Sequence, residues 1–104
     1  MKAIAVEITQ LVDDSTYPSL VECLLVDARG QVHRFVEKEA IVSSASVAAS
    51  AFPARGVIAC EVESEWVDAE GRSLVRAATT RPWGIESTAG GSSFVVLAEQ
   101  LREV

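Results

Sequence analysis

Residues 57–80 read VIACEVESEWVDAEGRSLVRAATT and hold the strongest structural signal in the chain. Apolar and polar side chains alternate along the first eleven of these residues, as they do in a strand with one buried face. The side chains expected on the buried face are Ile58, Cys60, Val62 and Trp66. The segment DAEG at 68–71 then forms a turn, because Asp accepts bonds from the backbone and Gly71 adopts a positive φ without strain. The stretch therefore predicts a β-hairpin that returns through Leu74.

The composition is that of a small globular domain. The 104 residues are 49% hydrophobic, with a mean hydropathy of +0.25, which is sufficient for one core. The apolar residues are mainly Val, Ala and Leu, in short runs bounded by turn formers, and this pattern favours strands over helices. We therefore expect a single all-β domain, mainly antiparallel, over residues 1–104.

A second hairpin is expected upstream. An alternating strand covers residues 3–12, and residues 20–27 form an almost continuous apolar run. The turn DARG at 27–30 shares Asp, Ala and Gly with the turn at 68–71, at a constant offset of 41 residues, and residues 32–37 return as the third strand. A duplication explains this offset, and so does convergence of two hairpins of equal loop length on the same turn residues.

The stretch 38–55 between the hairpins has no single interpretation. Ser43 can cap a helix, and the Ala-rich segment 45–51 supplies about two turns before Pro53 ends it. An irregular crossover is the alternative, because several serines weaken a helix.

The expected order is three strands, a short helix or crossover, and two or three further strands, the last at 94–98. This order resembles that of oligonucleotide- or oligosaccharide-binding (OB) barrels, in which a helix commonly separates the third and fourth strands. The resemblance is one of element order and carries no sequence motif, and an SH3-like barrel or a small sandwich fits the same order. The sequence thus predicts a barrel or sandwich of about six strands, and the order of elements assigns no function.

The charge of the chain restricts its partners. The net charge is −6 and the pI about 4.7, so nucleic-acid binding is not favoured, because that affinity comes mostly from Lys and Arg on phosphates. Long-range attraction would favour a basic protein partner. Seven of the nine basic residues are Arg, however, and arginines can build a local site for a carboxylate or phosphate.

The sequence also predicts a location. The apolar N-terminal run reaches Glu7 too early for a signal-peptide core, and no stretch has the length of a membrane helix. Cys23 and Cys60 lie in apolar strand segments and are expected as free thiols in a reducing cytoplasm, with a disulfide between them as the alternative. We therefore expect a cytoplasmic protein without a membrane partner.

Catalytic and cofactor motifs are missing from the sequence. The single histidine, His33, has no marked partner for acid–base or nucleophilic chemistry. There is no Gly-rich phosphate loop, no nucleophile elbow and no His-Glu metal motif. We expect no enzyme, no cofactor and no metal site, and the alternative is a small enzyme that uses His33 with acidic partners.

The first candidate binding site is a row of glutamates. Glu61, Glu63 and Glu65 are expected on one strand face at intervals of about 6–7 Å. Such a row can dock a basic partner, or it can serve only to keep an outer face hydrated and to guard a sheet edge.

The second candidate site is RPWGIE at residues 81–86. Arg81 can stack on Trp83 or offer a two-pronged contact to a carboxylate or phosphate, next to the charge of Glu86. Trp and Arg are enriched at binding hot spots. The alternative is that Trp83 plugs one end of the barrel and Arg81 covers it.

The favoured function is a non-catalytic protein-interaction module. The apolar strand at 94–98 carries little charge to protect its edge, so self-association as a homodimer is one form of this function. The alternative is an OB-like barrel that binds a small ligand or single-stranded nucleic acid by stacking on aromatic side chains. The aromatic residues of that alternative are Tyr17, Phe35, Trp66 and Trp83.

Overall fold

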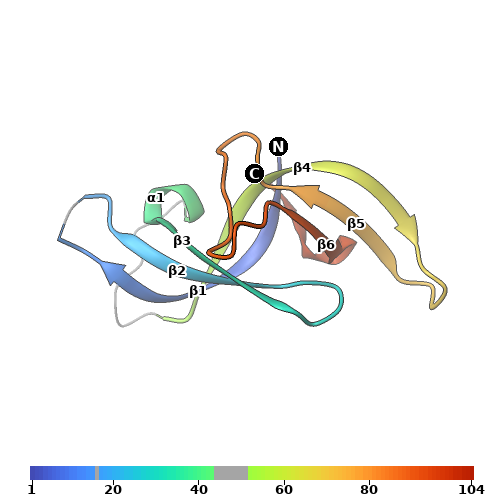
Figure 1. Ribbon diagram of the computed structural model, residues 1–104, viewed down its shortest axis with the longest axis horizontal. Helices are drawn as coiled ribbons and strands as arrows, with labels where there is room; N and C mark the ends of the chain where they lie inside the picture. The colour runs from blue at the N-terminus through green and yellow to red at the C-terminus, as the bar shows by residue number, and fades with distance from the viewer. Residues whose placement is uncertain (16, 44–51) are drawn as a thin grey trace.

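The computed structural model describes residues 1–15, 17–43 and 52–104. Its antiparallel sheet curls into a half-barrel, with one short helix after the third strand (Figure 1). The strands in the described residues are β1 (Lys2–Asp13), β2 (Leu20–Val26), β3 (Val32–Lys38), β4 (Ala54–Val67), β5 (Ser73–Ala78), β6 (Ser93–Leu97) and β7 (Leu101–Glu103). The helix α1 covers Glu39–Val42, and a 3-10 turn, η2, covers Ala98–Gln100. The prediction of an all-β, mainly antiparallel fold with a helix between the third and fourth strands is confirmed.

Two long strands connect the halves of the sheet. The strand order is β3-β2-β1-β4-β5-β6, with β7 beside the start of β1. β1 pairs with β4 through its first half and with β2 through its second half. β4 likewise pairs with β1 up to Cys60 and with β5 from Glu61 onward. The distal part of the β4–β5 hairpin, residues 61–76, therefore projects beyond β1, and we call it the hairpin arm (Figure 1).

The core lies on the concave side of the half-barrel. Apolar side chains from β1 to β6 and from α1 meet there, and most are almost completely shielded from water. Cys23 and Cys60 belong to this core and are free, so the predicted disulfide alternative is wrong. Burial raises the pKa of the Cys23 thiol to about 12, which keeps it protonated and unreactive.

Aromatic rings close the half-barrel where its two edge strands face each other. The Phe94 ring of β6 packs edge-on against His33 and Phe35 of β3, with ring centroids 4.8 and 5.6 Å apart. The Thr88 amide donates to the Arg34 carbonyl at 2.8 Å on the same side. The closure is thus a seam of side chains and single hydrogen bonds rather than a strand ladder.

The same seam caps the strand that was expected to self-associate. The Val95 carbonyl of β6 accepts a bond from the Ala28 amide at 2.9 Å. The Leu97 amide donates to Oε1 of Gln100 at 2.8 Å. These edge groups of β6 are satisfied within the chain and are not available to pair with a second copy.

The two hairpin turns have matching geometry. Asp27 and Asp68 each accept bonds at Oδ1 from the amides two and four residues further along, at 2.9–3.0 Å. Gly30 and Gly71 adopt φ values of 81° and 82°. The predicted turn chemistry is confirmed, and both explanations of the 41-residue offset remain compatible with it.

The described part of the crossover contains a helix ahead of the segment 45–51 that was predicted as helical. Ser43 directly follows α1 and its amide donates to the Glu39 carbonyl at 2.9 Å, so Ser43 caps the end of the helix and not its start. The position of α1 follows from packing, because Val42 is fully buried and the Glu39 amide bonds to the Ser19 carbonyl at 2.8 Å. The Ala-rich helix predicted over 45–51 lies outside the described residues.

A β-bulge at Glu63 reverses the alternation of β4. Before the bulge, Val62 faces the core. After it, Trp66 pairs with Leu74, on the face of β5 opposite to that of the buried Val75. Trp66 is 37% exposed, so the prediction that it points inward with Val62 is wrong.

Candidate functional site

Residues 81–86 belong to a loop that is bonded at its base. The buried Thr79 donates its hydroxyl to the Ile85 carbonyl at 2.6 Å, and the Ile85 amide donates to the Thr79 carbonyl at 3.0 Å. The Gly84 amide donates to the Thr80 carbonyl at 2.7 Å, with Gly84 at a φ of 63° that favours glycine. Ile85 is the apolar anchor of the loop, and Trp83 lies at its tip.

Trp83 is 60% exposed, and it does not plug the barrel. Arg81 and Glu86 are exposed as well. Within the described part of the chain neither residue forms an ion pair, and Arg81 does not stack on Trp83. The structure therefore places the three predicted side chains in one loop without bringing their functional groups together.

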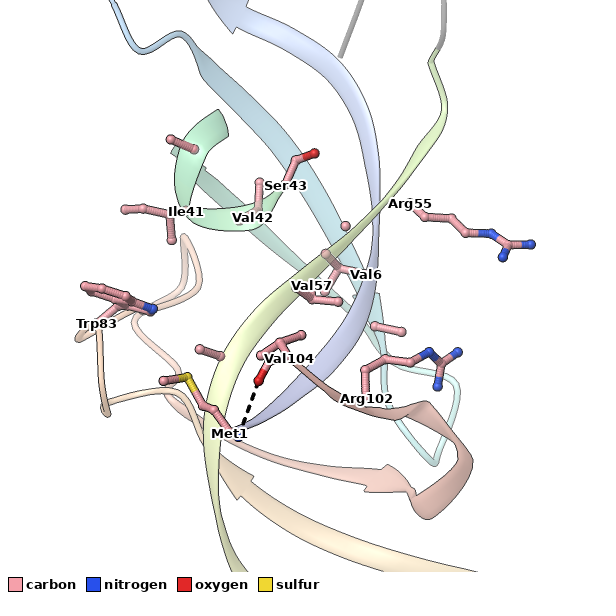
Figure 2. Close-up of a pocket in the computed structure, with 14 residues that line it drawn as sticks. Met1, Val6, Ile41, Val42, Ser43, Arg55, Val57, Trp83, Arg102 and Val104 are labelled. Atoms are coloured by element: carbon pink, nitrogen blue, oxygen red, sulfur yellow. Dashed lines mark hydrogen bonds between the residues drawn. The ribbon is translucent and has the colours of Figure 1, made fainter. Parts of the chain in front are cut away.

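Trp83 stands beside an open groove of about 770 Å³ (Figure 2). Ala5 of β1 and its cross-strand partner Val57 of β4 lie in the floor of the groove, and Gly56 lines it as well. Further apolar side chains line the groove, namely Ala40, Ile41 and Val42 of α1 and Ala59 of β4. The sequence did not indicate this groove, because its residues come from five separate segments.

Two arginines supply the charged side chains of the groove. Figure 2 shows Arg55 and Arg102 on the side of β4 opposite to Trp83. The Arg102 guanidinium donates to the Glu99 and Leu101 carbonyls at 2.6 and 2.9 Å, and no carboxylate pairs with either arginine in the described residues. No Asp or Glu side chain of the described residues lines the groove. In a chain with a net charge of −6, the charged side chains that line the groove are positive, and Glu7 lies opposite Arg55 across the β1–β4 ladder.

The glutamates of the first candidate site do not form a row on one face. Glu61 pairs with Ala78 and Glu65 with Val75, and positions three apart on β5 face opposite sides of the sheet. Glu63 is the bulged residue between them. All three carboxylates are exposed, but they are distributed around the hairpin arm.

The two arginines of the hairpin arm differ in their contacts. The Arg72 guanidinium bonds to Oδ2 of Asp68 at 2.8 Å and to the Ala28 carbonyl at 3.1 Å, so it links the two hairpin turns. The Arg72 amide and then its guanidinium hold the pKa of Asp68 below its ordinary value. Arg76 forms no ion pair within residues 1–15, 17–43 and 52–104.

His33 has a partner that the sequence did not mark. Its Nε2 lies 2.8 Å from Oδ2 of Asp27, the aspartate that forms the first turn. Because the imidazole also packs on Phe94, the pair fastens the turn to the seam of the barrel. The signal in the sequence was the Asp of a turn six residues before the only histidine.

The aromatic residues of the stacking alternative do not share a surface. Phe35 is fully buried, Tyr17 is exposed in the loop after β1, Trp66 lies on the hairpin arm and Trp83 beside the groove.

Comparison of the chain with protein-family models, with curated proteins and with solved structures found no match. No helix in the described residues is long and apolar enough to cross a membrane. Those residues also contain no cluster of three or more His, Cys, Asp or Glu side chains that could hold a metal ion.

Proposed function

We propose that this chain is a non-catalytic protein-interaction module that holds its partner in the groove beside Trp83. The observation that carries the proposal is an exposed tryptophan on a loop fixed at its base by the Thr79–Ile85 bonds. Tryptophan and arginine are the side chains most enriched at interface hot spots. A loop that is already bonded loses little conformational entropy when a partner binds.

The charge of the groove specifies the partner more closely than the net charge does. Exposed charges are screened beyond about 8 Å at physiological ionic strength, so the groups that touch the partner dominate the contact. Arg55 and Arg102 therefore favour a segment with acidic and apolar side chains. A basic partner at Glu61, Glu63 and Glu65 is less favoured, because these carboxylates do not share one face.

A small apolar ligand with a carboxylate is the second candidate. The groove volume of about 770 Å³ falls in the range of small-molecule sites, roughly 300–1,000 Å³. We propose a cytoplasmic location for either function, supported by the free thiols of Cys23 and Cys60. Nucleic acid stays disfavoured by the net charge.

The test is a capture experiment with the purified protein as bait in a lysate of its source cell. Wild type is compared with Trp83→Ala and with Tyr17→Ala, which removes an exposed aromatic ring outside the groove lining. We expect specific capture to be lost with Trp83→Ala and kept with Tyr17→Ala. Equal capture by Trp83→Ala and wild type would refute the proposal, and capture that disappears after nuclease treatment would indicate a nucleic-acid binder instead.

A further inference from the structure

The hairpin arm carries the exposed carboxylates that the groove lining lacks. Between residues 61 and 76 the sequence carries five carboxylates and two arginines. At its distal end Trp66 and Val67 are 37% and 65% exposed, next to Glu65 and the exposed Glu70. The arm thus combines exposed apolar side chains with excess negative charge, whereas the groove combines apolar walls with Arg55 and Arg102.

We infer that the hairpin arm of one copy of this chain docks in the groove of a second copy. The inference rests on the proposed function and names the partner of the same site. The apolar end of the arm covers the apolar walls beside Trp83, and the arm carboxylates meet the two arginines that have no carboxylate partner in the described residues.

The arm cannot fill the groove of its own chain. Val57 in the groove floor and Trp66 on the arm belong to the same strand, β4. Nine residues of extended strand separate them by about 30 Å, at a rise of about 3.3 Å per residue. Because the hydrogen bonds to β1 and β5 hold β4 extended, the occupant must come from another molecule.

The symmetry of the contact decides the size of the assembly. If two copies exchange arms about a two-fold axis, each arm fills the groove of the other copy and the assembly closes as a dimer. If the rotation does not close, the same contact extends into a longer chain of copies. Both forms contain the arm-in-groove contact.

The test is sedimentation velocity of the full chain over a concentration series of about 10–200 µM, where contacts of micromolar affinity are populated. The groove variant combines Arg55→Glu with Arg102→Glu, and the arm variant combines Glu65→Lys with Glu70→Lys. We expect wild type to self-associate and each variant alone to associate at least about tenfold more weakly, a loss of about 1.4 kcal/mol. Mixing the two variants pairs a basic arm with an acidic groove, and we expect the mixture to associate again.

The control combines Asp13→Lys with Asp14→Lys, two exposed residues at the end of β1 outside the arm and the groove lining, and changes the net charge as the arm variant does. Circular dichroism checks that every variant is folded. A wild-type protein that sediments as a single chain throughout the series would overturn the inference, and so would folded variants that do not associate when mixed. Capture of a different protein that depends on Trp83 would leave the proposed function standing in either case.

Discussion

The buried hydroxyl of Thr79 helps to determine that Trp83, four positions further along, is exposed. With Thr79 bonded to Ile85 through both its hydroxyl and its carbonyl, Ile85 enters the core and Trp83 is left exposed. The sequence predicted a binding loop at 81–86 because Trp, Arg, Pro and Gly have strong local preferences. It could not predict which of the two large apolar side chains is buried, since that depends on contacts with distant strands.

Replacing Thr79 with Val should destabilise the protein by about 1–3 kcal/mol, because the buried Ile85 carbonyl loses its hydroxyl donor while the shape of the side chain is kept. The free energy of unfolding, measured by urea denaturation, tests this expectation. Thr80→Val is the matched control, since Thr80 is exposed and its hydroxyl forms no bond within the described part of the chain, so a change of less than about 0.5 kcal/mol is expected there. Equal stability of Thr79→Val and wild type would contradict the role assigned to the hydroxyl.

At the scale of elements, the turns were predictable and the faces of β4 were not. The turns at Asp27 and Asp68 are determined by residues within five positions of each other, so the sequence alone specifies them. The bulge at Glu63 depends on the register between β4 and β5, which no local pattern encodes. The alternation therefore predicted the strand itself correctly. It placed Trp66 and Glu65 on the wrong faces of that strand, because it took no account of the bulge.

At Gly56, both α1 and β1 approach β4 closely. A Cβ atom there would lie 2.8 Å from Ile8 side-chain atoms and 2.9 Å from the Val42 carbonyl oxygen, which is backbone and cannot rotate away. Gly56→Ala should therefore push α1 outward and cost about 1–3 kcal/mol.

Thermal or urea unfolding measures that cost, and Ser64→Ala, an exposed site in the same strand, should change stability by less than about 0.5 kcal/mol. A Gly56→Ala protein as stable as the Ser64→Ala protein would show that α1 yields without cost.

At the scale of the whole molecule, the groove depends on residues that are far apart in the sequence. The groove collects Arg55, Arg102 and Trp83 from three segments that approach only when the sheet curls and β7 pairs with β1. Sequence reasoning found Trp83 through its own loop and missed both arginines, because neither lies in a motif. The all-β class, by contrast, follows from periodicity repeated along most of the chain, which survives errors in single elements.

Substitution of Phe94 tests whether the contacts that close the half-barrel open together. The seam amides of Ala28 and Thr88 bond across the open side to β6 and β3 and belong to no strand ladder, so their protection from hydrogen exchange depends on closure. In native-state exchange followed by NMR, we expect both amides to be protected in wild type.

Phe94→Leu keeps most of the volume but removes the ring contacts at 4.8 and 5.6 Å, at a cost of about 0.5–1.5 kcal/mol. Protection should fall at Ala28 and Thr88 more than in β1. The control Val75→Ala removes buried volume from β5 away from the seam and should lower protection evenly. Uniform loss in Phe94→Leu would instead mean that the barrel opens only by unfolding completely.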